Sequence, residues 1–371
     1  MRKRSGATVK KVLAEAQGLS VYDVGETVDG LARKLGKKPE QILKLNSNEN
    51  FFVPLDFLRN ILSESVGEVD PRIYPRDEYM ELKEALGKYL GVLPNQIVVG
   101  TGSDNLIDLV SRMMLGKGDE ALSISPTFSI YERCIRIQGA TYKPVPLKED
   151  FSLDTEGLLD AVSLKTKVIF LCSPNNPTAN SFACRDIEYL AKNFDGIVAV
   201  DEAYADFSGS SIIEAVGDYE NLVVFRTFSK VFGLAGLRLG CAVSNPVLAK
   251  VMDERFQMPY TVTLVTLRAS SKILGRMDVI NKAIDEVKVQ RSILIEALNK
   301  IVGVRAFGSE TNFVLFQTVK GSETVYKKLL DKGVIVRNIG QVLSSKNCLR
   351  VTVAPQPMMD RFLKALKEVL G

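Results

Sequence analysis

The chain has 371 residues, of which 46% are hydrophobic and 25% are charged, and its formal net charge is +4. This length allows a large core and about two domains. No long basic tract lies beyond the N-terminus, so nucleic-acid binding has no support, and no apolar run approaches the roughly 20 residues that cross a membrane.

The N-terminal part is polar and largely helical in pattern. Residues 1–11 are basic and contain no acid or apolar secretory segment. We expect a frayed tail there, with an organellar transit peptide as the alternative. Helices are predicted over Val28–Leu35, ending at Gly36, and over residues 79–90. The turn-rich residues 46–54 separate them.

Short, β-branched apolar segments then alternate with longer helical ones. This rhythm predicts a mainly parallel sheet covered by helices on both faces, which is a three-layer αβα arrangement. The expected strands are residues 97–99, 120–124, 141–145, 167–172, 196–200, 222–225 and 239–243, and helices are expected at 106–115, 128–138 and 186–193.

The remaining chain predicts a smaller α+β unit after a long helical region at residues 246–301. Its expected strands are 312–316, 334–336 and 349–353, with helices at 325–332 and 359–370. We therefore divide the chain into an arm with part of the small domain (1–50), a large domain (51–280) and a small domain (281–371). A helix crossing that boundary would suit domain motion over a cleft.

Two residue types limit the chemistry. The five cysteines are scattered without a C-x-x-C pair, which is typical of free thiols in a reducing cytoplasm and not of a metal site. Histidine is absent, which excludes Ser–His and Cys–His nucleophiles and His-ligated metals. Acid–base work must fall to Lys, Asp, Glu, Tyr or a cofactor.

Polar loops follow several strands of the large domain, at the edge where ligands collect in open α/β sheets. The loop 100–105 precedes a helix, and its glycines have no side chains to cover the backbone amides at the helix N-terminus. The loop could therefore bind a phosphate or be a plain capped turn. It does not match a dinucleotide fingerprint. Phe128 could stack on a flat ring or belong to the core, and Asn176 could present an amide from a proline-framed turn.

Two more loops carry the reactive groups. Asp201 ends a buried strand, where a carboxylate needs a salt bridge, a helix-cap role or a protonated pyridine as partner. Tyr204 would reach a ring hydroxyl. Lys230 is either a surface lysine or an amine that forms a Schiff base, and Arg238 with neighbouring hydroxyls could hold a phosphate. Together these groups predict a site for pyridoxal 5′-phosphate (PLP).

The chain resembles the fold-type I PLP-dependent enzymes of the class I/II aminotransferase family. The resemblance rests on P-N-N-P-T at 174–178, D-E-A-Y at 201–204 and S-K…G-L-A-G-L-R at 229–238. The segment L-N-S-N-E-N at 45–50 resembles the branch that acts on histidinol phosphate. The implied activity is transfer of an amino group between L-histidinol phosphate and 2-oxoglutarate, in histidine biosynthesis.

The resemblance also implies roles for single residues. Lys230 would bind the cofactor covalently and move the substrate proton, and Asp201 would keep the pyridine nitrogen protonated. Asn176 and Tyr204 would bind the ring oxygen, and Phe128 would stack on the ring. The cofactor phosphate would be held by Ser103, Asp104, Thr227, Ser229 and Arg238.

Substrate anions would pair with Arg350 and Arg337, since one guanidinium fork can bind either a phosphate or a carboxylate. Tyr22 and Asn48 are also expected at the substrate end. Tyr74 would reach the cofactor phosphate of a neighbouring subunit, which implies an obligate homodimer with shared active sites.

Three positions depart from the family pattern: Phe51 with Phe52, Asn105, and Ala179 in place of a glycine that can adopt positive φ. We expect Phe51 near the substrate gate.

The alternatives to the implied activity are an aromatic amino-acid aminotransferase, a threonine-phosphate decarboxylase and a non-enzymatic PLP-sensing regulator. The regulator is disfavoured because no DNA-binding module fits before the first phosphate loop, and a dehydrogenase because its fingerprint fails.

Overall fold

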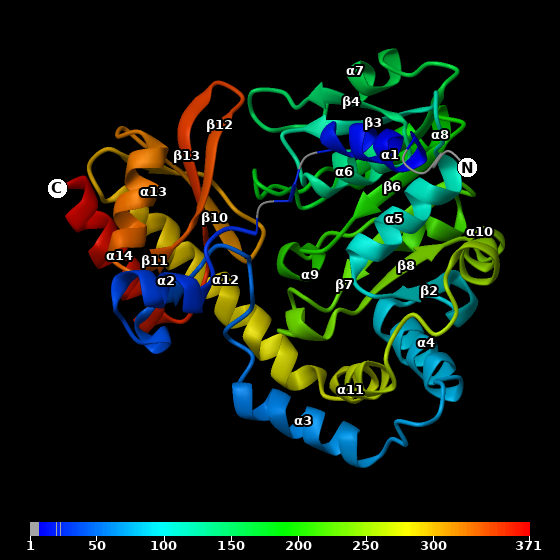
Figure 1. Cartoon of the computed structure of the whole chain (residues 1–371), viewed down its shortest axis with the longest axis horizontal. Helices are drawn as coiled ribbons and strands as arrows, with labels where there is room; N and C mark the ends of the chain where they lie inside the picture. Colours follow the sequence, from blue (N-terminus) through cyan, green and yellow to red (C-terminus); the bar gives the residue numbers. More distant parts are fainter. Residues whose placement is uncertain (1–6, 20, 23) are drawn as a thin grey trace, which may run out of the picture.

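A seven-stranded sheet forms the centre of the larger unit in the computed structural model, which describes residues 7–19, 21–22 and 24–371 (Figure 1). The strand order is β2-β8-β7-β6-β5-β3-β4, and only β8 runs antiparallel to its neighbours. The predicted, mainly parallel sheet is thus confirmed. Its strands are β2 (Ile97–Gly100), β3 (Glu120–Ser125), β4 (Thr141–Pro146), β5 (Thr166–Cys172), β6 (Ile197–Asp201), β7 (Leu222–Thr227) and β8 (Gly240–Ser244).

The central strands are largely apolar because both faces of the sheet are covered. Val198 and Val200 of β6 belong to one hydrophobic cluster, whereas Ile197 and Ala199 belong to the cluster on the opposite face. The alternation extends to Asp201, which contacts Tyr131 of the second cluster, and to Glu202 just past the strand, which contacts Ile212 of the first. It therefore directs consecutive side chains into different surroundings.

Helices cover both faces of this sheet. One cluster includes residues of α5 (Ser103–Met114) and α6 (Ile130–Ile137), and the other includes residues of α8 (Cys184–Asn193) and α11 (Leu264–Leu274). The sequence pattern did not predict α3 (Leu55–Gly67), which follows Pro54 without a side-chain cap. The remaining helices of this unit are α4 (Asp77–Leu90), α7 (Thr155–Asp160), α9 (Ala205–Ser208) and α10 (Pro246–Val251).

The smaller unit is built on a four-stranded antiparallel sheet of order β12-β13-β10-β9. The short strand β1 (Leu43–Lys44) pairs with β11 (Val334–Ile335), so the segment before residue 50 joins this unit. The long helix α12 (Met277–Asn299) runs from one unit to the other (Figure 1). The domain limits at 50 and 280 stay predictions. The other elements are β9 (Val304–Ala306), β10 (Phe313–Thr318), β12 (Arg337–Val342), β13 (Ser345–Thr352), α13 (Ser322–Asp331) and α14 (Gln356–Leu370).

The N-terminal segment is more ordered than expected. Helix α1 (Ala7–Gln17) includes residues 7–11, so the frayed tail is wrong for that stretch. Over the whole helix, good helix formers such as Ala, Lys and Leu prevail. Residues 1–6 lie outside the described part. Helix α2 (Val28–Leu35) has its predicted limits, with Thr27 capping its start and Gly36 in the left-handed conformation at its end. Among the described helices, none is long and apolar enough to cross a membrane.

Candidate active site

A cavity of about 570 Å³ opens where the carboxyl ends of the parallel strands face β12 and β13 of the smaller unit. It is lined by every residue that the sequence predicted for the site except Tyr74. The cavity is also lined by Asn46, Ser47, Glu49 and Cys172, for which no role was predicted from the sequence. Loops that are far apart in sequence thus meet at one edge of the sheet, as expected for this architecture.

Asp201 lies at the floor of this cavity, and only 2% of it is exposed. One carboxylate oxygen accepts a hydrogen bond from the Tyr131 hydroxyl (2.9 Å), and the other accepts one from the Ala203 amide (3.1 Å). Within the described residues Asp201 takes part in no ion pair. Burial raises the pKa of Asp201 to about 6, and the Tyr131 hydrogen bond opposes that rise.

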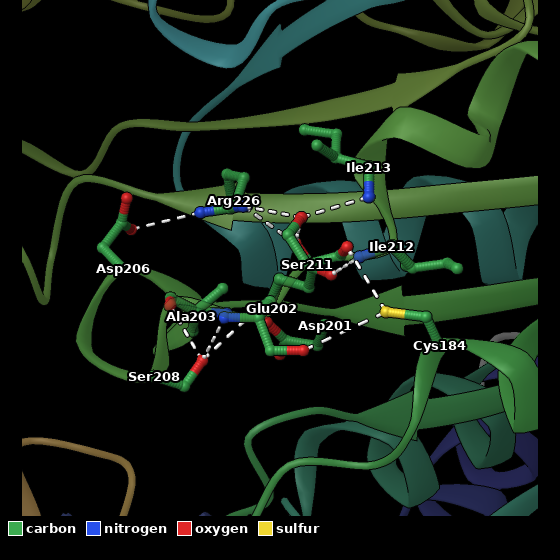
Figure 2. A network of polar contacts seen from close by, with 12 residues as sticks. Cys184, Asp201, Glu202, Ala203, Asp206, Ser208, Ser211, Ile212, Ile213 and Arg226 are labelled. Atoms are coloured by element: carbon green, nitrogen blue, oxygen red, sulfur yellow. Dashed lines mark hydrogen bonds and ion pairs between the residues drawn. The ribbon is translucent and has the colours of Figure 1, made fainter.

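Glu202, the next residue, takes part in a network of polar contacts with Arg226 and Ser211 (Figure 2). Its carboxylate pairs with Arg226 (2.9 Å) and accepts hydrogen bonds from the Ser211 hydroxyl (2.6 Å) and the Ile212 amide (2.6 Å). Arg226 also contacts Asp206 (3.2 Å). Burial alone would lower the pKa of Arg226, but the two carboxylates raise it. This network is internally paired and lies outside the cavity.

Lys230 follows β7 and points into the cavity, so it is not a surface lysine. Its Nζ atom donates to the Ser47 carbonyl (2.9 Å) and lies 5.9 Å from the centre of the Tyr204 ring. Burial lowers the pKa of Lys230 to about 8, and the nearby Arg350 cation adds to this. An amine of this pKa is partly neutral near pH 7, which a nucleophile or a general base requires.

The start of α5 forms a cradle for an anion. No side chain caps its first amides, and a Cβ on Gly102 would lie 2.7 Å from an Arg238 nitrogen. A Cβ on Gly240 would lie 2.6 Å from the Ser103 amide nitrogen, so both glycines are needed for this close approach. Arg238 contacts the Ser229 hydroxyl (3.2 Å) and the Asp104 carboxylate (3.0 Å). The uncapped amides of α5, the Ser229 hydroxyl and the Arg238 guanidinium are donors that fit a phosphate group.

Thr227 and Phe128 complete the cofactor side. The Thr227 hydroxyl donates to the Leu239 carbonyl (3.3 Å) and accepts from the Ser229 amide (3.2 Å). The loop of Phe128 is fixed by Asn175, whose side chain accepts from the Thr127 hydroxyl (2.7 Å) and donates to the Pro126 carbonyl (2.9 Å). The sequence reasoning missed Asn175, although it lies within the P-N-N-P-T motif.

Arg350 occupies the substrate side and is 8% exposed. It donates to the Asn176 side-chain oxygen and to the Asn46 carbonyl (2.6 Å), while its Nε atom has no partner among the described residues. Burial lowers the pKa of Arg350, and Arg337, its neighbour across β12 and β13, lowers it further. Within the described residues Arg350 takes part in no ion pair, which favours an anionic ligand beside it.

Tyr204 and Asn48 form a buried pair in the same wall. The Tyr204 hydroxyl accepts a hydrogen bond from the Asn48 amide (2.9 Å), so its own proton remains for a ligand oxygen. Burial raises the pKa of Tyr204, which keeps the phenol protonated. Asn48 therefore holds Tyr204 in place in addition to lining the cavity with Tyr22.

The departures from the family pattern cause local adjustments only. Asn105 accepts hydrogen bonds from the Thr101 amide (3.3 Å) and the Gln257 amide (3.4 Å). Ala179 adopts φ 67°, the conformation for which glycine is usual. Phe51 does not line the active-site cavity. It lines a second hollow beside α12 with Phe52, so its expected place at the substrate gate finds no support.

Tyr74 lies outside the cavity, on the surface of the protein. It is 73% exposed, and its ring stacks on that of Tyr260 at 4.6 Å. Ile73 and Met258 beside them in sequence are also exposed. These residues form an apolar surface around the stacked tyrosines.

The chain belongs to the aminotransferase class I and II family, whose sequence model matches residues 40–366. It is 38% identical to a histidinol-phosphate aminotransferase of a Thermoanaerobacter species over 329 residues, covering 88% of this chain and 93% of that protein. It is also 38% identical to the histidinol-phosphate aminotransferase of Methanosarcina mazei over 349 residues, covering 93% of each chain.

Solved structures agree with this assignment. The histidinol-phosphate aminotransferase from Sinorhizobium meliloti in complex with pyridoxal-5′-phosphate superimposes with a TM-score of 0.86 and 25% identity, covering 100% of this chain and 98% of that one. The L-threonine-O-3-phosphate decarboxylase from Porphyromonas gingivalis shares the fold, with a TM-score of 0.76, 24% identity, and coverage of 89% and 99%. The predicted aminotransferase family and fold class are thus confirmed.

Proposed function

We propose that this protein is a PLP-dependent transaminase that converts L-histidinol phosphate and 2-oxoglutarate to imidazole acetol phosphate and L-glutamate. The observation that carries the proposal is the set of unpaired charges around one cavity. Within the described residues, Asp201 is a buried carboxylate that pairs with no cation, and Arg350 is a buried cation that pairs with no carboxylate. Lys230 lines the same cavity, and burial lowers its pKa to about 8.

The residues of the cavity fit PLP from end to end. The cradle at the start of α5, with Thr227, Ser229 and Arg238, would hold the phosphate. Asp201 would face the pyridine nitrogen, and Asn176 with Tyr204 would face the ring oxygen. When bound, PLP supplies an electron sink that stabilises negative charge on the substrate carbon. Phe128 would lie against the ring.

The protein's own contribution is orientation and proton movement. Asp201, short of a charged partner, would stabilise a protonated pyridine. Lys230 would hold the cofactor through its Nζ atom, and as a free amine it would accept the proton of the substrate carbon and donate it again. Its pKa of about 8 permits both directions near neutral pH.

The substrate end supports an anionic amino donor. Histidinol phosphate carries a phosphate and no α-carboxylate, while 2-oxoglutarate carries two carboxylates. Arg350 and Arg337 can pair with either kind of anion, so one site would serve both half-reactions. The similarity to histidinol-phosphate aminotransferases supports this choice over an aromatic amino-acid donor.

Two copies of the chain would form the working enzyme in this proposal. The exposed Tyr74 and Tyr260 lie on the apolar surface that a partner would cover. Tyr74 would then reach the phosphate cradle of the partner, and an active monomer in gel filtration would contradict that role. All five cysteines are free thiols, in keeping with a cytoplasmic enzyme.

Turnover assays with competing donors test the proposed substrate. Purified protein with added PLP would be supplied with 2-oxoglutarate and either histidinol phosphate, phenylalanine or threonine phosphate. We expect glutamate formation to be fastest, by kcat/KM, with histidinol phosphate. A preference for phenylalanine would instead assign an aromatic aminotransferase, and release of carbon dioxide from threonine phosphate would assign a decarboxylase.

A further inference from the structure

Tyr131 is a buried side chain to which neither the sequence motifs nor the proposed mechanism gives a role. It lies on α6, is completely inaccessible to solvent, and places its hydroxyl 2.9 Å from Asp201. Burial raises the pKa of Tyr131, so its hydroxyl stays protonated and donates to the carboxylate. A phenol in this position contacts a buried carboxylate that lines the cavity.

The ring of Tyr131 is fixed by two other aromatic rings. It stacks on Phe170 of β5 with centroids 5.4 Å apart and an angle of 4°. The ring of Phe128 meets it edge to face at 5.8 Å and 87°. Such pairs prefer these geometries and contribute beyond simple burial. Phe128, which lines the cavity, therefore rests on the same side chain that holds Asp201.

The two hydrogen bonds to Asp201 fix its carboxylate group in one orientation. Tyr131 holds one oxygen and the Ala203 amide holds the other. A carboxylate can accept about four hydrogen bonds, so acceptor positions remain for a ligand in the cavity. Without Tyr131 only the backbone contact would define the orientation.

We propose that Tyr131 is a positioning residue for the transamination proposed above: it orients and keeps charged the Asp201 carboxylate, and it supports Phe128 against the other side of the same ligand ring. The inference rests on the proposed function. The hydrogen bond favours the charged carboxylate, against the effect of burial. The other titratable groups around Asp201 are Cys172 on β5, Asp104 on α5, Lys230 after β7 and Tyr204 after β6.

The substitution Tyr131→Phe tests this inference because it keeps the aromatic stack and removes the hydroxyl. Tyr79→Phe is the matched control, since Tyr79 also donates to a carboxylate, that of Asp253 (2.6 Å), outside the cavity. PLP would be titrated into each apoprotein across a range of pH. We expect Tyr131→Phe to weaken PLP binding about tenfold. We also expect the acid limit, the pH below which PLP no longer binds, to rise by about one unit. Tyr79→Phe should change neither the affinity nor the acid limit.

Different failures point to different errors. If wild-type protein binds PLP and catalyses transamination but Tyr131→Phe matches it in affinity and acid limit, the inference is wrong and the proposed function stands. If wild-type protein does not bind PLP, both the inference on Tyr131 and the proposed function are wrong. If Tyr131→Phe does not fold, Phe170→Leu takes its place, because it loosens the stack and keeps the hydroxyl. A smaller shift of the acid limit in the same direction supports the inference, and an unchanged limit overturns it.

Discussion

Asp201 and Glu202 are consecutive carboxylates, equally buried, and they lie in opposite surroundings. Glu202 finds the Arg226 cation and two neutral donors within the fold (Figure 2). Asp201 finds a phenol and an amide but no cation in the described chain. The alternation of side chains along β6 produces this separation, because it directs the two residues to opposite faces of the sheet.

The comparison shows how a functional carboxylate can be told from a structural one. A buried charge is costly unless it is paired. For Glu202 the fold supplies the pair, so its charge has no need of a ligand. Burial raises the pKa of both carboxyl groups, so the difference lies in their partners: Asp201 has no cation among the described residues to offset the cost of burying its charge. A cationic ligand in the cavity would relieve that cost and would be held tightly for the same reason.

The largest effect is expected when the charge on the cavity side is removed. Asp201→Asn keeps the size of the side chain and a hydrogen bond to Tyr131 but loses the negative charge. We expect kcat/KM to fall about 10²- to 10³-fold, the usual cost of removing one preorganised group that stabilises developing charge. Steady-state assays at saturating PLP measure the loss. An activity within threefold of wild type would mean that Asp201 is structural.

Removing the charge of Glu202, on the other face of the sheet, should lower stability and leave catalysis unchanged. Glu202→Gln leaves Arg226 with Asp206 alone and breaks a buried pair, which costs about 3 kcal/mol or more. Urea unfolding measures this change in the free energy of unfolding. With the folded fraction taken into account, kcat should remain near the wild-type value. A stable variant that has lost its activity would reverse the comparison.

The pH dependence of apoprotein stability should reveal the strained carboxylate. The pKa of Asp201 is about 6 in the folded state against 3.8 for the free group, so the folded state binds more protons between these values. The stabilising contribution is present below pH 3.8 and is lost as pH rises through 6, about 3 kcal/mol in all. Lys230, with a pKa of about 8, does not change charge in this window.

Unfolding experiments on wild type and Asp201→Asn between pH 4 and 7 isolate the contribution of Asp201 to the free energy of unfolding, because the other carboxylates contribute equally in the two proteins. Wild type should lose stability relative to the variant as pH rises. A constant difference between the two proteins would show that burial does not strain Asp201.

A smaller effect is expected at the substrate end. Arg350→Lys keeps the charge but replaces the planar fork with a single ammonium group. We expect KM for histidinol phosphate and for 2-oxoglutarate to rise together, by about tenfold, with PLP binding unchanged. Initial-rate measurements with each substrate varied in turn would check this. A rise for only one of them would mean that the two anions use separate sites.

The residues of the site that lie at or directly after the ends of buried strands could be predicted from the sequence. Asp201, Lys230 and the cradle before α5 are local features of buried strands and the turns after them. Tyr131 could not be predicted as a partner of Asp201, because it is 70 positions away and looks like an ordinary apolar residue of a helix. The contact of Arg350 with Asn46 spans 304 positions and depends on how the two units pack.

The most direct measurement of the central claim is the site of covalent attachment of PLP. Wild-type protein with PLP would be treated with borohydride, which fixes the cofactor to the amine that holds it, and the peptides would be analysed by mass spectrometry. The account predicts one modified residue, Lys230, and no modification in Lys230→Ala. A cofactor fixed to a different lysine, or none fixed at all, would contradict it.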